Sequence, residues 1–472
     1  IFSLLLRLFS IGMRYYSLLL SLLLIFLVLM STYGQERVWT RMLGTVDKDE
    51  GFGVSVDTST GHAYVTGFTS GAVNGEAFAG GDDIILLKYA SNGTTVWTRM
   101  VGTIGDDAGR GVAVDNSTGH VYVTGTAAGT LHGQANAGGS DIVLLKYATD
   151  GTSVWTRRVG SGGTDEGMGV CVDTSTGDVY VTGYARGALH GQVYAAGMDI
   201  ILLKYASNGT RVWTRLVGTN GDDVGRGVAV DISTGHVYVT GSARGSLHGE
   251  PYLGATDIML MKYASNGTRV WTRMVGSGGN IDDGYGVSVD FSTGHVYVTG
   301  SAGGTLHGQA YLGITDITLL KYASNGTRVW TRSVGTAGWD EGLGVSVDTS
   351  TGHVYVAGYV SRTLHGEAYA GGTDIVLIKY ASNGVRVWTR LVGTSGDDEG
   401  RGVSVDAGRA LVYVTGEVAA SMHGELYSGD LDIVSLCYNN QTILSPTVSP
   451  TVTPTRLPTL SPTSPTISPS VC

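Results

Sequence analysis

Residues Gly111-Val-Ala-Val-Asp115 and His120-Val-Tyr-Val-Thr-Gly125 are two short runs rich in β-branched and aromatic side chains at alternate positions. Ser-Thr-Gly-His joins them and supplies the polar and flexible residues that a tight turn requires. Two similar runs flank this pair, at 96–101 and 141–147. Such runs, bounded by Gly, Asn, Asp or Ser, are typical of β-strands, and none of them has the 3.6-residue period of a helix. This part of the chain therefore predicts four consecutive strands.

The same four runs recur along the chain at a constant spacing. A period of this size indicates a solenoid, a propeller or an array, and the type of element within each unit decides among them. Seven units of four strands predict an all-β fold, a seven-bladed β-propeller of four-stranded antiparallel blades, because radial stacking buries both faces of each sheet. Val-Trp-Thr-Arg occurs seven times at intervals of 58 residues, with one interval of 59, and its Trp residues are Trp39, Trp97, Trp155, Trp213, Trp271, Trp330 and Trp388.

The two ends of the repeat array complement each other. The first unit begins with a Trp strand at 38–43, and the last unit stops at 432–438 without one. We therefore expect one N-terminal strand to complete the last blade beside three C-terminal strands. This closure removes the exposed sheet edges that β proteins otherwise have to protect. A β-solenoid is the alternative, but its turns are typically shorter and it explains no such missing strand.

The repeat resembles a known family. Gly-x-Gly-Val-x-Val-Asp, then His-Val-Tyr-Val-Thr-Gly, then Asp-Ile-x-Leu-Leu-Lys-Tyr is similar to the seven-bladed β-propeller repeat called SBBP. The resemblance covers residues 38–438, and its most specific part, Val-Tyr-Val-Thr-Gly, occurs for example at 121–125 and 237–241. The chain departs from the family by a His where Asn is common at the hairpin, and by a longer loop before Asp-Ile. The resemblance implies a secreted or surface propeller and brings no established catalytic residues.

The N-terminus reads as a targeting segment. A charged start at Met13-Arg14 is followed by an apolar run of 13 residues and by small residues before Gly34. This pattern predicts a signal peptide over 1–34, with Met13 as the true start. The alternative, a membrane anchor, needs about 20 apolar residues.

The C-terminus changes composition after the last predicted strand, so we place the propeller at 35–438. Ser-Pro-Thr units fill 439–472, and such a segment buries too little apolar surface to fold. We expect it to be a disordered, Ser/Thr/Pro-rich stalk that carries O-glycans. The protein would then be secreted or held at the cell surface, and a membrane tether would require sequence beyond Cys472.

Composition excludes several classes of function. The chain has a formal net charge of −10, so no basic stripe is available for nucleic acid. Its three Cys residues lack metal-ligand spacing, and so do the His residues that occur once in each of six long loops at intervals of about one unit. Gly-Arg-Gly-Val is not a dinucleotide-binding fingerprint, because no helix is predicted after it. We expect no nucleic acid partner, no cofactor and no metal.

The loops divide into two faces. In propellers generally, the loop that enters the inner strand and the loop from the second to the third strand share one face, here called the top. The second of these loops is long in every unit, and long connections are often functional. Five glycosylation sequons fall in hairpins of the opposite, bottom face, which would leave the top bare; the alternative is that Asn and Thr simply suit tight turns. With a sixth at the foot of the stalk, the sequons start at Asn92, Asn116, Asn208, Asn266, Asn325 and Asn440.

One Asp recurs in each loop that enters an inner strand, usually with a second acid beside it. Because the spacing of a calcium-binding loop is missing, we expect the recurring Asp to accept backbone N–H groups at a turn. The second acid, as at Glu50, Glu166 and Asp106, we interpret as surface charge. The recurring residues are Asp49, Asp107, Asp165, Asp223, Asp282, Asp340 and Asp398.

Each long top loop of the last five units carries His, then Gln or Glu, then Tyr. An aromatic plate beside hydrogen-bonding groups is suited to neutral polyols, and five copies would form a multivalent array. The alternative is that each Tyr packs within its own loop. The candidate ligand-binding residues are His190, Gln192, Tyr194, His248, Glu250, Tyr252, His307, Gln309, Tyr311, His365, Glu367, Tyr369, His423, Glu425 and Tyr427.

Catalysis usually requires a unique constellation that breaks the repeat symmetry. The few residues that differ from their counterparts in other repeats, here called symmetry breakers, form no known catalytic motif. They include Trp339, Arg110, Arg226 and Arg401. The sequence therefore predicts a non-catalytic module that binds an extracellular glycan or protein through its top loops. A polysaccharide-acting hydrolase or lyase, with acids from the top loops near the central channel, and a structural spacer are the alternatives.

Overall fold

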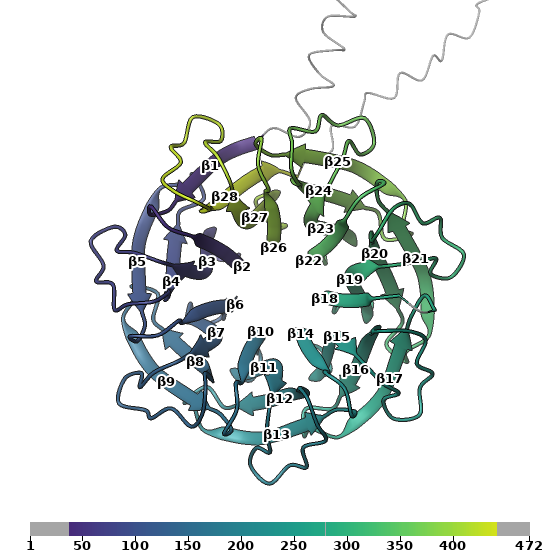
Figure 1. Cartoon of the computed structure of the whole chain (residues 1–472), viewed down its shortest axis with the longest axis horizontal. Helices are drawn as coiled ribbons and strands as arrows, with labels where there is room; N and C mark the ends of the chain where they lie inside the picture. Colours follow the sequence, from purple (N-terminus) through teal and green to yellow (C-terminus); the bar gives the residue numbers. More distant parts are fainter. Residues whose placement is uncertain (1–36, 279, 441–472) are drawn as a thin grey trace, which may run out of the picture. The chain divides into compact units, whose positions relative to one another are not determined.

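The protein folds as a ring of seven four-stranded sheets around one axis (Figure 1). The computed structural model describes residues 37–278 and 280–440. All strand pairings within the sheets are antiparallel, so the predicted all-β, seven-bladed propeller is confirmed. The described strands run from Arg37 to Asn439, beside the predicted 35–438. The predicted signal peptide and nearly all of the predicted stalk lie outside the described residues.

We number the blades I to VII in the order of their inner strands. The inner strands are β2 (Asp49–Asp57), β6 (Ala108–Val114), β10 (Glu166–Asp173), β14 (Val224–Asp231), β18 (Asp282–Asp290), β22 (Asp340–Asp348) and β26 (Glu399–Asp406). The second strands are β3 (His62–Thr69), β7 (Val121–Ala127), β11 (Asp178–Ala185), β15 (His236–Ala243), β19 (His295–Ala302), β23 (His353–Val360) and β27 (Leu411–Val418).

The two remaining positions of each blade are filled in the same way. The third strands are β4 (Asp83–Tyr89), β8 (Asp141–Tyr147), β12 (Asp199–Tyr205), β16 (Asp257–Tyr263), β20 (Asp316–Tyr322), β24 (Asp374–Tyr380) and β28 (Asp432–Asn439). The outer strands are β5 (Thr95–Val101), β9 (Ser153–Val159), β13 (Arg211–Val217), β17 (Arg269–Val275), β21 (Arg328–Val334), β25 (Arg386–Val392) and, in blade VII, β1 (Arg37–Leu43).

The ring is closed by strands from both ends of the chain. Blade VII has the order β1-β28-β27-β26, and β1 pairs with β28 so that Thr40 lies opposite Leu436. One N-terminal strand and three C-terminal strands therefore complete the last blade, as the sequence predicts. Closure leaves no blade with a missing outer strand.

The core lies between neighbouring blades. Third strands such as β4 are buried at all seven positions, which explains why Asp-Ile-Ile-Leu-Leu-Lys-Tyr lacks the alternation of a half-exposed strand. Second strands contribute one fully buried Tyr each, for example Tyr64 at 0% exposure. Burial on both faces makes each blade depend on its neighbours.

The Val-Trp-Thr-Arg motif fastens six of the seven outer strands to the next blade, the exception being β25, where the indole N–H of Trp388 is buried without a hydrogen-bond partner. At the point of closure, Trp39 donates its indole N–H to the carbonyl of Ser91 at 2.9 Å, and Arg41 donates Nε–H to the carbonyl of Gly93 at 2.8 Å. The same pair of bonds recurs at five other blade boundaries, for example from Trp330 at 3.2 Å. At these six boundaries the recurrence of the motif thus serves the ring rather than a ligand.

The recurring loop Asp has the structural role that the sequence predicts. Asp340 accepts hydrogen bonds from the backbone N–H groups of Thr336 and Ser361, and the corresponding bonds occur at the other six loops. It is fully buried, and its own N–H donates to the carbonyl of Thr315 in the preceding blade at 3.1 Å. The loop Asp therefore ties two blades together.

A second buried Asp, at the start of the third strand of the preceding blade, faces the loop Asp. A Cβ at Gly335 would lie 2.3 Å from Oδ1 of Asp316 and 3.0 Å from Oδ2 of Asp340, so the two carboxyl groups are neighbours. Burial, and then the charge of Asp340, raise the pKa of Asp316 to about 6. Oδ1 has no hydrogen-bond partner in six third-strand residues, Asp83, Asp141, Asp199, Asp257, Asp316 and Asp432.

Candidate functional site

The predicted His residues of the long loops lie against their own blades. Each occupies a left-handed conformation, with φ of 51° at His190, and begins a His-Gly turn in which the carbonyl of Leu189 accepts the N–H of Gln192. The imidazole Nδ1 of His190 is 2.9 Å from the hydroxyl of Thr214 in β13. The same contact, at 2.7–2.9 Å, fixes His132, His248, His307, His365 and His423.

The Glu and Tyr members of the predicted groups also have partners within the protein. Glu250 forms an ion pair with Arg273 at 3.3 Å, and Glu367 and Glu425 pair with arginines of their own blades in the same way. The Tyr hydroxyl donates to a carbonyl three residues further on, as from Tyr252 to Ala255 at 2.7 Å. The loops project at separate positions around the ring (Figure 1), so the five groups are not brought together. Their role in binding stays a prediction.

The predicted glycosylation sites differ in exposure. Asn92, Asn208, Asn266 and Asn325 are exposed in hairpins between third and outer strands, and Asn116 is exposed in a hairpin after an inner strand. Asn440 is different, because it is only 7% exposed and its Oδ1 accepts hydrogen bonds from Tyr355 and Lys379. Burial therefore argues against the prediction of a glycan at Asn440.

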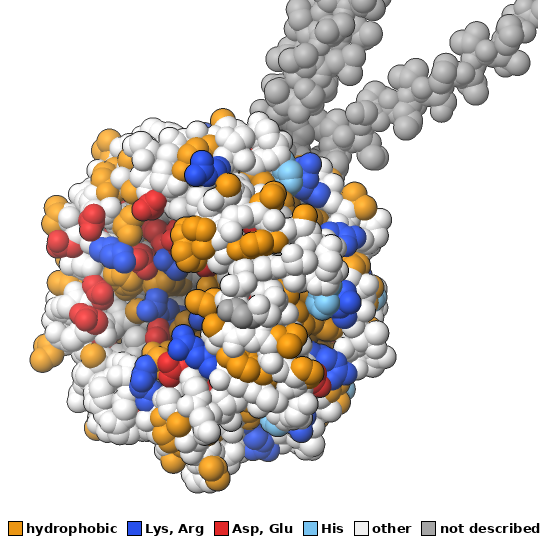
Figure 2. Space-filling model, turned by 45° about the vertical axis from the view of Figure 1, so that its right-hand side comes forward, with side chains coloured by type: hydrophobic (Ala, Val, Ile, Leu, Met, Phe, Trp, Pro, Cys, Tyr) orange, Lys and Arg blue, Asp and Glu red, His pale blue; other side chains and the backbone are white. Residues whose placement is uncertain are grey.

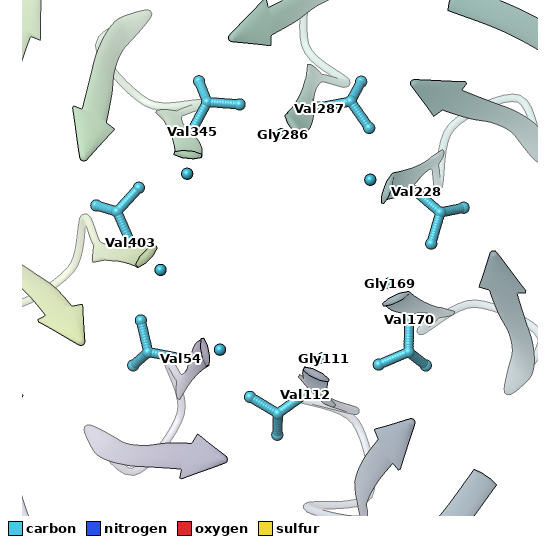
Figure 3. Close-up of a pocket in the computed structure, with 14 residues that line it drawn as sticks. Val54, Gly111, Val112, Gly169, Val170, Val228, Gly286, Val287, Val345 and Val403 are labelled. Carbon is cyan, nitrogen blue, oxygen red and sulfur yellow. The ribbon is translucent and has the colours of Figure 1, made fainter. Parts of the chain in front are cut away.

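A narrow channel runs along the axis of the ring. Seven Gly-Val pairs, one from each inner strand, line a cavity of about 190 Å³ (Figure 3). Glycine is required here because neighbouring inner strands approach closely; a Cβ at Gly111 would lie 3.1 Å from the carbonyl oxygen of Met168. The lining of this cavity carries no titratable side chain and offers no chemistry of its own.

Seven larger side chains surround the end of the channel nearest the long loops. The register of each inner strand shifts between its two Gly residues, and the extra residue lies at a bulge. Residues of adjacent blades touch there: the guanidinium of Arg110 lies 4.2 Å from the centre of the Phe52 ring. We call these residues the mouth ring: Phe52, Arg110, Met168, Arg226, Tyr285, Leu343 and Arg401.

Acidic side chains surround the mouth ring and are bound to it. Arg401 contacts Glu417 at 2.6 Å, Glu399 at 3.0 Å and Glu50 at 3.8 Å. Burial raises the pKa of Glu417 to about 8, although Arg401 opposes this effect. Charged side chains of both signs are visible around the central hollow (Figure 2). This cluster breaks the repeat symmetry, as the three arginines in the sequence already indicate.

The interpretation of the second acid as surface charge is wrong where that acid follows the recurring Asp. Glu50 is 6% exposed, and Glu166 accepts hydrogen bonds from Arg110 at 2.5 Å and from Tyr184 at 3.0 Å. Burial raises the pKa of Glu341, which accepts hydrogen bonds from two Tyr hydroxyls. An acid after the Asp stands on the inner strand, at the channel mouth, whereas an acid before it, such as Asp106, stays exposed in the loop. In the sequence, the available signal for burial was whether the second acid stands before or after the recurring Asp.

A second hollow lies away from the axis, among the top loops of blades IV, V and VI. It has a volume of about 520 Å³. We call it the rim groove, and its lining residues are Ala255, Asn280, Ile281, Gly303, Tyr311, Gly313, Ile314, Thr315 and Trp339. Of the fifteen predicted ligand-binding residues, the groove contains only Tyr311. It also contains Trp339, which the sequence marks as a symmetry breaker, and Ile281, which sequence reasoning missed.

The described part of the chain, 37–278 and 280–440, offers neither a cluster of metal-ligating side chains nor a helix that could span a membrane. No group of three or more His, Cys, Asp or Glu side chains in these residues could hold a metal ion. The same residues include no helix with the length and apolar character needed to cross a membrane.

The repeat pattern is matched by a family model. Residues 212–248, which include nearly all of β13 and the whole of β14 and β15, match the β-propeller repeat SBBP. The chain contains an SBBP repeat and folds as a seven-bladed β-propeller. The matched residues include Val237-Tyr-Val-Thr-Gly241, the motif on which the resemblance depends.

Other known proteins are similar to parts of this propeller. The regulatory protein FlaEY of Caulobacter vibrioides is 28% identical over 190 residues, which are 36% of this chain and 20% of that protein. The chain thus spans about a fifth of that relative. A Bacteroides caccae protein of unknown function has 12% identity, a TM-score of 0.37 and coverage of 70% of this chain and 93% of that one. The β-propeller domain of the Trilobed protease from Pyrococcus furiosus has 8% identity and a TM-score of 0.42, with coverage of 83% of this chain and 94% of that one.

Proposed function

We propose that this chain is a secreted or cell-surface propeller that binds an extracellular glycan or protein through the loops of its top face and catalyses no reaction. The distribution of exposed apolar side chains carries this proposal. Single exposed apolar residues are normal, whereas their accumulation on one face is typical of binding surfaces. Ten of these large side chains belong to the top loops: Val46, Phe78, Ile104, Val193, Leu253, Ile281, Leu312, Ile314, Trp339 and Leu426.

The remaining exposed apolar side chains form no comparable surface. Six are Val residues that directly precede a Trp of an outer strand, so they repeat around the circumference. The other two, Val385 and Phe291, lie in bottom hairpins. The contrast between the two faces supports binding through the top, and it argues against a spacer, which needs no exposed apolar loops.

A polysaccharide-acting hydrolase or lyase is the second candidate, and the channel mouth favours it. A carboxyl with a raised pKa, such as that of Glu417, is suited to act as a general acid. However, Glu417 is 3% exposed and contacts Arg401 through both of its oxygens at 2.8 Å. Because a substrate would have to displace these bonds, we favour binding without chemistry.

The experiment uses the secreted full chain on arrays of glycans and of extracellular proteins, followed by analysis of bound glycans for released products. We expect saturable binding and intact ligand. Product release that Glu417→Gln abolishes would establish the enzyme instead. A chain that binds neither class would leave only the spacer and overturn the proposal. Phe291→Ala is the control, because it removes an exposed aromatic ring from the bottom face.

A further inference from the structure

Two residues that line the rim groove depart from the pattern of the seven repeats. The residue before each recurring loop Asp is charged or polar in five of them: Lys48, Asp106, Thr164, Asp222 and Asp397. In blades V and VI the same position is occupied by Ile281 and Trp339, which are 50% and 51% exposed. The one 59-residue interval also falls here, because the loop 277–281 has one residue more than its counterparts. The groove is therefore a local departure from the repeat rather than a consequence of it.

The walls of the groove are held in place before any ligand arrives. Tyr311 donates its hydroxyl to the carbonyl of Ile314 at 2.7 Å, and Ile314 N–H donates to the carbonyl of Gly338 at 3.0 Å. The backbone N–H of Trp339 donates to Ser361 Oγ at 3.1 Å. Groups fixed in this way lose little conformational entropy on binding.

The chemistry of the groove selects an uncharged ligand with apolar faces and polar edges. None of its nine lining residues is ionised near neutral pH, so a charged ligand would find no counter-charge. Two aromatic rings, Tyr311 and Trp339, offer apolar surface, and the amide of Asn280 offers both donors and acceptors. The described residues include no acceptor for the indole N–H of Trp339. A volume of about 520 Å³ lies within the range of about 300–1,000 Å³ typical of small-ligand sites.

We propose that the rim groove is a single binding site for a neutral saccharide, with Trp339 and Tyr311 contacting the faces of the sugar rings and Asn280 bonding their hydroxyl groups. This proposal rests on the proposed function of the top face and gives it one ligand class and one place. It replaces an array of five equivalent loops with one asymmetric site. The other four Tyr residues of the long loops then serve to fix their own loops.

The test compares variants of the full chain on an array of neutral and acidic oligosaccharides. Trp339→Asp restores the residue type that three other repeats have at this position, so the fold tolerates it. Tyr369→Ala is the matched control for Tyr311→Ala, because Tyr369 occupies the same loop position in blade VI and donates to the carbonyl of Gly372 but lies outside the groove. Thermal unfolding monitors the fold of each variant.

We expect the wild type to bind neutral saccharides, Trp339→Asp and Tyr311→Ala to weaken binding at least tenfold, and Tyr369→Ala to change it less than twofold. Equal losses for Tyr311→Ala and Tyr369→Ala, or unchanged binding by Trp339→Asp, would overturn the groove while leaving the proposed function intact. Binding confined to acidic saccharides would refute the assignment of a neutral saccharide as the ligand. Binding of a protein that Trp339→Asp abolishes would refute it as well. A wild type without any ligand would overturn both proposals.

Discussion

The buried Asp pairs at the blade boundaries predict that removing a carboxyl group stabilises the protein. Asp316 is 1% exposed, its Oδ1 has no hydrogen-bond partner, and its neighbour Asp340 is fully buried and also acidic. Two adjacent buried carboxyl groups cannot both be ionised without cost. Asn at position 316 keeps the shape, can accept the N–H of Leu312 as Oδ2 of Asp316 does, and offers its amide N–H to Asp340.

The size and sign of the effect follow from the pKa of Asp316. Burial and Asp340 raise this pKa from 3.8 to about 6, a difference worth about 3 kcal/mol between the two protonation states. Below pH 4 the carboxyl is protonated in both the folded and the unfolded chain, and stability is unaffected. As the pH rises from 4 to 6 the unfolded chain releases its proton first, so the wild type loses stability. Above pH 6 the loss is complete, and Asp316→Asn should then be more stable by up to about 3 kcal/mol.

The assay is urea unfolding of wild type and Asp316→Asn at intervals between pH 4 and pH 8. The matched control is Asp348→Asn, because Asp348 is also buried but accepts hydrogen bonds from Ser350 and Thr351. Burial acts to raise the pKa of Asp348, but these bonds outweigh it and the pKa is lowered. Asp348→Asn should therefore destabilise the protein by a nearly constant amount between pH 4 and pH 8, because the stability that a lowered pKa provides is lost only below the ordinary value of 3.8.

The two variants must thus diverge as the pH rises. A stability gain in Asp316→Asn that is the same at pH 4 and pH 8 would show that the carboxyl charge is not its origin. A loss of stability at pH 8 would refute the reasoning altogether, since it would mean that the ionised pair is favourable. A smaller gain with the expected pH profile would leave the sign intact and correct only the magnitude.

Three further predictions concern the ring and its faces. Arg401→Ala should lower the free energy of unfolding at pH 9 by about 3–5 kcal/mol, because it leaves the Glu417 carboxylate buried without its cation. At pH 7 Glu417 binds a proton, so the loss should be smaller. Denaturant unfolding at the two pH values measures both losses. Deletion of 37–43 exposes the edge of β28, so size-exclusion chromatography should show association that the full chain lacks. When the chain is expressed through a eukaryotic secretory pathway, enzymatic removal of N-glycans should shift its mass, and Asn440→Gln should not change that shift, because Asn440 is buried.

The fold could be predicted in full because every level of the sequence agrees with it. The interval between Trp residues gives the number of blades, the four short runs give the strands, and the unpaired strand at 38–43 gives the closure. The role of the recurring Asp was also predictable, because a residue repeated seven times has to serve the repeat. Symmetry is strong evidence for structure and weak evidence for function.

The candidate site was predictable only in part, for the same reason. The repeated His, Gln or Glu, and Tyr residues attract attention by their number, yet the His, Glu and Tyr side chains have partners in their own blades, as His190 does with Thr214. The rim groove depends on contacts between loops of three blades, which no single repeat encodes. Its sequence signals are one inserted residue in 277–281 and one Trp at 339, and only the fold shows that they are neighbours.

The composition of blade VII has a consequence for the synthesis of the protein. Its outer strand, β1, leaves the ribosome before any other strand, and its partner β28 leaves after all of them. Until β28 has been synthesised, β1 has no partner strand in the nascent chain, and the ring that contains blades I to VI cannot close. A truncated product that ends before Asp432 therefore lacks the partner of β1, however many blades it has already built, and the bond between His423 and Thr40 is among the last that a growing chain can form.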